Sequence, residues 1–322
     1  MADMDARAAL WFSDATADAS DWTVDDLLEL KARQPGQRVS VVIPARNEEA
    51  TVADVVGQIR ENLVAGVPLV DELVVMDSLS TDETATRARA AGATVWSVAD
   101  VVPELGVRRG KGEALWKSLF ISGGDILVFI DADLTDWGVH FVTGLLGPLL
   151  SRPQVQLVKG FYDRKLDLGD GVAAEGGRVT ELVARPWLAL HRPELSAVVQ
   201  PLAGEWAIRR DHFASLSVPH GYGVELATLL DTHARRGLDS IAQVDLGQRA
   251  HVHQSIHDLS AMATEIMAVA ERRGGVVISD SVPLPLIKRD RTWLVRDVAT
   301  SERPPAATLL ESPAHLRLKE TP

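Results

Sequence analysis

The chain has 322 residues, 46% of them hydrophobic, and its 33 basic and 45 acidic residues give a formal net charge of −12. This apolar content supports a globular enzyme built on one large domain or a domain and a half. The charge excludes a non-specific nucleic-acid binder and a protein held electrostatically to an anionic membrane. With no cysteine, disulfides and thiolate sites are excluded, and no leader or membrane-spanning pattern is found. We therefore expect a cytoplasmic protein with no nucleic-acid or membrane partner.

Residues 1–37 are acidic and rich in alanine, and we expect a lead-in with a helix from Trp22 to Lys31. The regular fold is predicted to start after the turn at Pro35 and Gly36. Strands are then expected at Val39 to Ile43, Glu72 to Met76, Thr94 to Val98 and Ile126 to Ile130. Helices are expected after Asn47, after Thr84 and from Gly110 to Phe120. The alternation predicts an α/β fold with a mainly parallel sheet flanked by helices and ligands at the strand carboxyl ends.

The second half of the chain has a looser rhythm. A strand is expected at Val155 to Lys159, and helices at 179–190 with an interruption at Pro186, at 224–236 and at 258–273. We divide the chain into a lead-in at 1–37, a nucleotide-binding half at 38–150, an acceptor-binding half at 151–275 and a tail at 276–322. Five prolines in the tail predict a poorly ordered or partner-wrapping segment.

The strand at Ile126 to Ile130 ends in Asp131-Ala132-Asp133. In extended backbone, residues two apart point the same way, so both carboxylates can address one divalent cation. For the bare motif, a plain helix-capping role is about equally common. Two more strand ends carry polar groups, at 44–49 and at 77–78, and parallel strands place such ends on one rim of a sheet. The set favours a site that handles phosphates.

Several motifs together carry a specific resemblance. Val-Val-Ile-Pro-Ala-Arg-Asn-Glu-Glu at 41–49, Asp-Ser-x-Ser-Thr-Asp-x-Thr at 77–84 and the aspartate pair resemble nucleotide-sugar-dependent glycosyltransferases of the GT-A (Rossmann-like) fold. More narrowly, the segments at 110–116, 176–182, 221–225 and 249–251 are similar to the glucosyl-3-phosphoglycerate synthase family and its mannosyl relative. The likeness runs from about residue 22 to about residue 270, and the ordered set is far more specific than any single motif.

The resemblance implies a retaining, metal-dependent homodimer that moves glucose from UDP-glucose to the 2-hydroxyl of 3-phosphoglycerate. It implies Mg²⁺ or Mn²⁺ on Asp133 and His251, with Asp131 and Ala132 at the nucleotide ribose or the metal's water. Lys111 would contact the diphosphate, and the nucleoside pocket would be lined by Pro44, Ala45, Arg46, Glu48 and Ser78, with Glu48 nearest the base.

For the acceptor, a glycine turn enters a helix at 177, where an anion is held well by N–H groups and a guanidinium. The resemblance makes Gly177, Arg178, Val179 and Thr180 the phosphate site, with Tyr222, Arg249 and His253 helping to hold the acceptor. Glu225 would position hydroxyls, and the Leu202 carbonyl would assist attack on the donor's front face. His253 replaces an asparagine of the family, Leu79 a glycine and Arg46 an apolar residue.

Three alternatives remain open at this stage. A GDP-mannose-dependent mannosyl enzyme shares most of these motifs. The segment Ile-Asp-Ala-Asp-Leu-Thr at 130–135 also resembles the nucleophile motif of haloacid-dehalogenase-like phosphatases, in which the first aspartate is phosphorylated. In that class the motif ends the first strand, whereas several strand–helix units precede it here. The third alternative is a nucleotide-sugar-binding protein without turnover.

Overall fold

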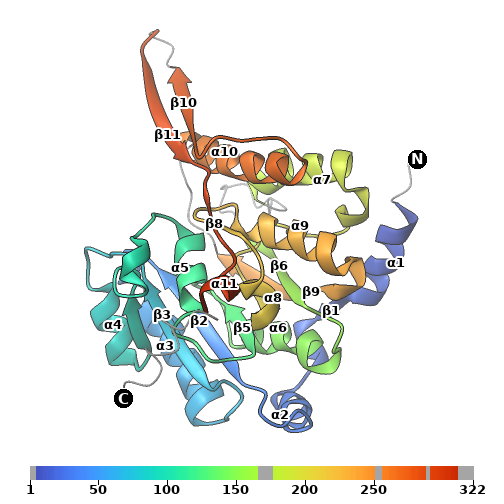
Figure 1. Ribbon diagram of the computed structural model, residues 1–322. Helices are drawn as coiled ribbons and strands as arrows, with labels where there is room; N and C mark the ends of the chain where they lie inside the picture. Colours follow the sequence, from blue (N-terminus) through green and yellow to red (C-terminus); the bar gives the residue numbers. More distant parts are fainter. Residues whose placement is uncertain (1–4, 166–176, 251–255, 288–290, 311–322) are drawn as a thin grey trace.

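The computed structural model describes residues 5–165, 177–250, 256–287 and 291–310 (Figure 1). Its centre is an eight-stranded sheet in the order β1-β9-β6-β7-β5-β2-β3-β4. All neighbours in this sheet pair in parallel except β7, which is antiparallel to β5 and to β6. The strands are β1 (Thr16–Asp18), β2 (Val39–Ala45), β3 (Glu72–Asp77), β4 (Thr94–Ser97), β5 (Ile126–Phe129), β6 (Leu157–Lys165), β7 (Trp206–Arg209) and β9 (Ile241–Ala250). The predicted mainly parallel α/β sheet is confirmed.

Both faces of the sheet are buried, because alternate strand residues enter two separate apolar cores. Val42, Leu127 and Phe129 belong to one core, and their neighbours Val41 and Val128 to the other. The first core is covered by α1 (Ala6–Ala15), α5 (Lys111–Ser118), α8 (Arg210–Ala214), α9 (Val224–Arg236) and α10 (Ile256–Arg273). The second is covered by α2 (Val24–Ala32), α3 (Val52–Ile59), α4 (Thr84–Ala91) and α6 (His140–Ser151).

Short helical turns complete the main body of the fold. The 3₁₀ turns are η1 (Ala19–Asp21), η3 (Pro103–Leu105), η5 (Pro193–Leu195) and η6 (Leu238–Ser240), and the π-helical turns are η2 (Arg60–Ala65) and η4 (Thr180–Ala184). The helix expected at 179–190 is interrupted one residue before Pro186, where η4 passes into α7 (Arg185–His191). Proline fits the first turn of α7, since the missing N–H has no partner in a first turn.

The predicted start of the regular fold is wrong. The lead-in contributes α1 and also β1, which pairs in parallel with β9 at the sheet edge. Trp11 of α1 is 5% exposed and donates from Nε1 to the Ile241 carbonyl oxygen at 2.9 Å. Strand β1 was not predicted because it is only three residues long and lies in an Ala-rich segment.

The tail is expected to be poorly ordered or partner-wrapping, but the poorly ordered alternative is wrong for residues 276–287 and 291–310, which contain three strands and a helix. Strands β10 (Ser281–Ile287) and β11 (Trp293–Ala299) pair as an antiparallel hairpin that projects from the body (Figure 1). Strand β12 (Glu302–Arg303) pairs with β8 (Val218–Pro219), and α11 (Ala307–Leu310) follows. Prolines at 283 and 285 are tolerated because a two-stranded hairpin consists of edge strands. Residues 311–322 lie outside the described chain.

Candidate active site

A cavity of about 740 Å³ opens at the carboxyl ends of β2, β3 and β5. Most of the residues that the sequence indicated line it together. Its walls include Pro44, Ala45, Arg46, Glu48, Ser78, Lys111, Asp131, Ala132, Asp133, Gly177, Arg178, Val179, Thr180, Leu202, Tyr222 and Glu225. Although the chain is strongly acidic, five of the described residues that line this cavity are cationic, namely Arg46, Arg108, Arg109, Lys111 and Arg178. The cavity is therefore suited to an anionic ligand.

The loops after β2 and β3 are tied to each other at one wall. The Asn47 backbone N–H donates to Ser80 Oγ at 3.0 Å, and Asn47 Oδ1 accepts from the Thr81 N–H at 2.9 Å. Asn47 and Leu79 both have a left-handed backbone, with φ of 57° and 60°. This conformation favours glycine or asparagine and is strained for leucine, which explains why glycine would suit position 79.

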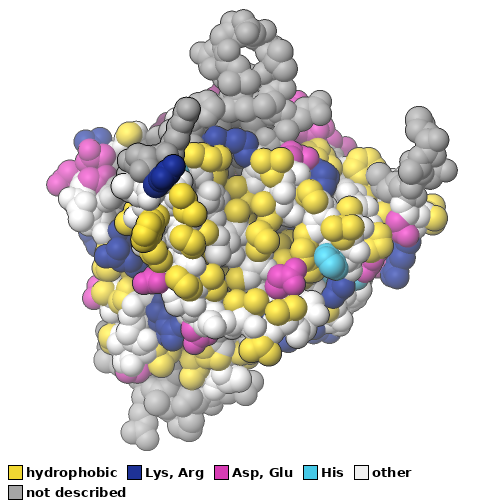
Figure 2. Space-filling model, turned by 90° about the horizontal axis from the view of Figure 1, so that it is seen from above, with side chains coloured by type: hydrophobic (Ala, Val, Ile, Leu, Met, Phe, Trp, Pro, Cys, Tyr) yellow, Lys and Arg dark blue, Asp and Glu magenta, His cyan; other side chains and the backbone are white. Residues whose placement is uncertain are grey.

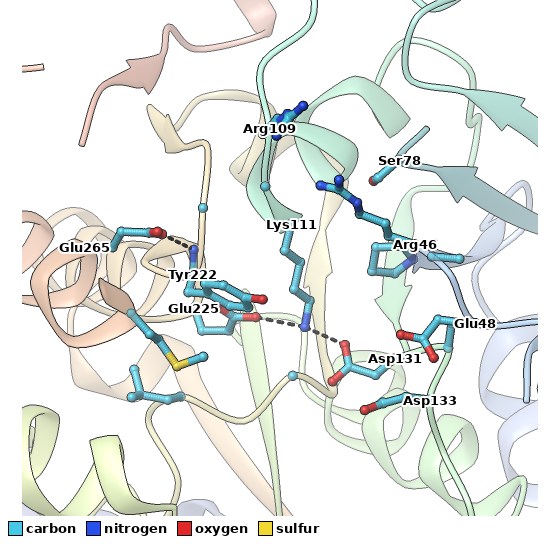
Figure 3. A pocket seen from close by; sticks show the side chains of 18 of the residues that line it. Arg46, Glu48, Ser78, Arg109, Lys111, Asp131, Asp133, Tyr222, Glu225 and Glu265 are labelled. Carbon is cyan, nitrogen blue, oxygen red and sulfur yellow. Dashed lines mark hydrogen bonds and ion pairs between the residues drawn. The ribbon is translucent and has the colours of Figure 1, made fainter. Parts of the chain in front are cut away.

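Lys111 joins the two sides of the cavity (Figure 3). It is the first residue of α5, and its Nζ lies 2.5 Å from Asp131 Oδ1 and 2.9 Å from Glu225 Oε1. Burial alone would lower the pKa of Lys111, but the charges of Asp131 and Glu225 outweigh burial and raise it. Lys111 is therefore a permanent cation, and it holds a carboxylate from the β5 end against one from the start of α9.

Glu48 lies beside the aspartate pair (Figure 3). Burial, and after it the charges of Asp133 and Asp131, together raise the pKa of its carboxyl to about 7. The part of the cavity formed by Glu48, Asp131 and Asp133 thus carries more negative charge than the single positive charge of Lys111 can balance. A divalent cation placed there would be favoured by the same charges that disfavour ionised Glu48.

The charge at Glu48 gives a pH-dependent prediction for the metal-free protein. Between the ordinary pKa and about 7, the folded chain keeps a proton that the unfolded chain releases, so stability falls as pH rises through this range. Glu48→Gln should raise the unfolding temperature by about 2–4 °C at pH 8, and the gain should shrink toward pH 5. Thermal unfolding in a chelating buffer measures this. An equal rise in unfolding temperature at pH 5 and pH 8 would contradict the raised pKa of Glu48.

The opposite wall comes from η4, the start of α9 and α10. Thr180 is 3% exposed, and Tyr222 precedes α9, whose second residue is Glu225. Glu265 of α10 accepts the Tyr222 backbone N–H at 2.8 Å through Oε2, so α10 fixes the loop that presents Tyr222. Sequence reasoning missed Arg109 and Glu265, because neither belongs to a motif that carries the family resemblance.

Lys159 contacts the turn that contains Leu202, and sequence reasoning did not identify it as a site residue. It is 1% exposed, and its Nζ donates to the Ala203 carbonyl oxygen at 2.8 Å. Burial lowers its pKa to about 8. A buried lysine inside a strand signals no function in a sequence, yet it fixes the turn that carries Leu202 into the cavity.

Among the described residues, no group of three or more His, Asp or Glu side chains forms a metal site. His251, the expected second ligand, and His253 lie outside the described residues, and Arg249 is described only as backbone of β9. The carboxylates that are described nevertheless fit a hard divalent cation, since Glu48, Asp131 and Asp133 lie together in one part of the cavity and carboxylate oxygens are ligands for such ions (Figure 3).

Comparisons with known proteins agree with this geometry. Residues 40–140 match the family model "Glycosyl transferase family 2". The chain is 49% identical to glucosyl-3-phosphoglycerate synthase of Mycolicibacterium smegmatis over 93% of this chain and 98% of the relative. It is 40% identical to the synthase of Petrotoga mobilis over 89% and 91% of the two chains.

Solved structures give the same result. The Mycobacterium tuberculosis synthase in complex with Mn²⁺, UDP-glucose and phosphoglyceric acid matches with a TM-score of 0.80 and 46% identity, over 89% of this chain and 95% of that chain. The complex of the same enzyme with Mn²⁺, UDP and glucosyl-3-phosphoglycerate matches with a TM-score of 0.79 and 46% identity, over 89% and 96%.

The fold and the cavity define a nucleotide-sugar-dependent glycosyltransferase of the GT-A class. The chain belongs to the glucosyl-3-phosphoglycerate synthase family. The aspartate motif ends the fifth strand of the chain and belongs to a glycosyltransferase, so the phosphatase interpretation is wrong. In the described part of the chain, no helix is both long and apolar enough to span a membrane.

Proposed function

We propose that the cavity binds UDP-glucose against the carboxyl ends of β2, β3 and β5 and 3-phosphoglycerate against η4. Glucose then passes from the donor to the 2-hydroxyl of the acceptor. The observation that carries this proposal is the cavity itself, in which Lys111 links Asp131 to Glu225 while Arg178 lines the same space. The relatives named for this reaction, and the solved complexes with UDP-glucose and phosphoglyceric acid, support it.

Each donor-side residue has a defined task in this proposal. The nucleoside lies along Pro44, Ala45 and Ser78, and the Glu48 carboxyl forms a hydrogen bond with the base. Arg46 adds a cation at this wall, where its exposed guanidinium can meet the ribose or the diphosphate. Asp131 and Ala132 lie at the ribose.

Charge builds on the diphosphate as the anomeric C–O bond breaks, and preorganised positive charge lowers that barrier. Lys111 is held by two carboxylates before the substrate arrives, so its ammonium needs no reorganisation. Asp133 and His251 would hold Mg²⁺ or Mn²⁺, which supplies a second positive charge to the leaving group when bound. The remaining protein contribution is orientation of the donor in this cavity.

We propose retention of the anomeric configuration through attack on the front face. Glu225 is engaged with Lys111 and is assigned to holding hydroxyls, not to forming a glycosyl bond. The Leu202 backbone carbonyl, on the turn fixed by Lys159, is assigned to stabilising positive charge that develops on the sugar. A glycosyl–enzyme adduct trapped and seen by mass spectrometry would contradict this pathway.

A donor panel tests the proposed reaction. Each of four donors is incubated with 3-phosphoglycerate and Mn²⁺: UDP-glucose, GDP-glucose, GDP-mannose and ADP-glucose. Release of the nucleoside diphosphate is then measured. Turnover with UDP-glucose well above the others is expected. Preference for GDP-mannose would favour the mannosyl alternative, and binding without turnover would overturn the assignment as an enzyme.

Arg178 gives a prediction for the acceptor. Arg178→Ala should raise KM for 3-phosphoglycerate about 10–100-fold, since it removes charged hydrogen bonds to the acceptor anion, with UDP affinity nearly unchanged. Steady-state kinetics and calorimetry measure the two effects separately. Arg185→Ala is the matched control, because Arg185 lies seven residues further along and pairs with Glu181 instead of lining the cavity. An equal loss of UDP affinity would contradict the division of the cavity.

We infer a homodimer built on the projecting β10–β11 hairpin. Two-stranded hairpins are only marginally stable alone, and Ile287, Trp293 and Leu294 are each more than half exposed. The side of the molecule seen in Figure 2 also gathers apolar side chains across its middle. Sedimentation should show a dimer for the wild type and monomers for Trp293→Ser combined with Leu294→Ser. A wild-type monomer would contradict the inference.

The cytoplasm is the proposed location. Both substrates carry several charges and cross lipid bilayers poorly without a transporter.

A further inference from the structure

Residues 300–306, called here the C-terminal strap, connect the projecting hairpin to the back of the cavity wall. The strap follows β11 directly, and its strand β12 pairs with β8 through Glu302 with Pro219 and Arg303 with Val218. Strand β8 leads straight into the loop that carries Tyr222. Ala306, at the end of the strap, is fully buried.

The centre of the strap is a buried ion pair between Arg303 and Glu113 of α5. Arg303 donates from Nε to Glu113 Oε2 at 2.8 Å and from Nη2 to Oε1 at 2.7 Å. Arg303 is 5% exposed and Glu113 1% exposed. The pair is bidentate and buried, and Glu113 lies only two residues after Lys111, so the pair fixes the start of the helix that presents that lysine.

The same guanidinium also holds the loop before α5. Arg303 Nη1 donates to the Leu105 carbonyl oxygen at 3.0 Å, and Nη2 donates to the Gly106 carbonyl oxygen at 3.1 Å. Trp116 Nε1 donates to the Pro304 carbonyl oxygen at 2.8 Å. One strap residue therefore bonds to both the loop and the helix that supply residues 107–111 to the cavity.

A second contact lies nearer the cavity mouth. Arg108 Nη1 lies 2.9 Å from His220 Nε2 and donates to Ser301 Oγ at 3.1 Å. Arginine can only donate, so His220 accepts through Nε2 and its remaining ring proton lies on Nδ1, which is 3.2 Å from Ser301 Oγ. The strap thereby fixes a cavity arginine and the residue that precedes the Gly221 and Tyr222 loop.

Two glycines show how closely these segments pack. A Cβ added at Gly112 would lie 1.8 Å from the Pro219 carbonyl oxygen, and one at Gly110 would lie 2.4 Å from that of His220. The start of α5 and the segment after β8 are thus in direct backbone contact, so a displacement of one displaces the other.

We propose that Arg303 is a positioning residue for the transfer reaction, which holds residues 107–111 in the conformation that receives the donor's diphosphate. Arg303 does not line the cavity and acts through Glu113 and the loop carbonyls. The inference rests on the proposed placement of the diphosphate at Lys111. It adds that donor affinity depends on a segment almost 200 residues further along the chain.

The test is Arg303→Lys, which keeps the charge but cannot donate in the bidentate pattern of arginine. We expect KM for UDP-glucose and the Kd for UDP to rise about five-fold or more, with KM for 3-phosphoglycerate within about two-fold of wild type. Arg209→Lys is the matched control, since Arg209 also donates to two carbonyl oxygens but lies on the interior strand β7 and does not line the cavity. It should leave both KM values unchanged even where its unfolding temperature falls.

An unchanged donor KM in folded Arg303→Lys would overturn the proposal, whatever its unfolding temperature. If that variant does not fold, Glu113→Gln provides the second measurement, because it keeps the side-chain shape but removes the charge that Arg303 bonds to. A rise in donor KM of about five-fold or more is then expected, and a donor KM within about two-fold of wild type would overturn the proposal. Turnover of UDP-glucose by the wild type is measured separately. Failure of the proposed role of Arg303 is therefore distinguishable from failure of the proposed function.

Discussion

Asp133→Ala is expected to lower kcat at least about 10²–10³-fold, with no recovery at high Mn²⁺ or Mg²⁺. The variant removes a charge from the corner where burial, Asp133 and Asp131 together raise the Glu48 pKa. If Asp133 holds the cation as proposed, the cation would lose an anchor, and the departing diphosphate would lose the positive charge that the cation supplies. Steady-state kinetics over a metal titration measure the effect, and manganese binding followed by electron paramagnetic resonance measures its cause.

The control for Asp133 is Asp136→Asn, three residues further on and outside the cavity lining. Asp136 has a φ of 55°, a conformation that asparagine adopts readily, so this change should leave both activity and folding near wild type. Asp133→Ala should also bring the Glu48 pKa down, because a like charge has been removed. Full activity of Asp133→Ala at saturating metal would contradict the metal assignment.

Lys111→Met is expected to cost both activity and stability. It leaves Asp131 and Glu225 on either side of the lost ammonium without their cation, and breaking a buried pair in this way costs about 3–5 kcal/mol. The same ammonium is assigned to the diphosphate, so kcat/KM for UDP-glucose should fall about 10²-fold or more. Thermal unfolding and donor kinetics measure the two losses.

Two features distinguish this result from general damage. Stability of Lys111→Met should recover in part on acidification, because one of the two carboxylates can then take a proton. Lys111→Arg keeps a cation and should retain most of the stability while donor KM rises, since the planar guanidinium does not reproduce the geometry of an ammonium. A loss of stability that is identical at pH 5 and pH 8 would contradict the role of the carboxylates.

The first half of the fold was predictable because its local signals agree. Val52, Val55, Val56 and Ile59 recur at helical spacing after Asn47, and all four are fully buried on one face of α3. The ends of β2, β3 and β5 meet at one rim because parallel strands must do so, which is why Arg46, Ser78 and Asp133 could be placed together from the sequence.

Other features depend on contacts between distant parts of the chain and leave no local signal. Strand β12 has two residues, too few for a periodic pattern. Arg303 reads as a surface arginine beside prolines until its partner Glu113, 190 residues earlier, is known. The cavity roles of Arg109 and Glu265 likewise depend on where a loop and α10 come to lie.

The antiparallel strand β7 has a consequence for synthesis on the ribosome. It pairs with β5 on one side and with β6 on the other, so it joins the strands made early to those made late. Until residues 206–209 emerge, β5 has an open edge, and β1 must wait for β9, more than 220 residues later. Such distant pairings form slowly and expose strand edges to neighbouring chains meanwhile. The nascent chain can therefore complete its sheet only after most of it has been translated.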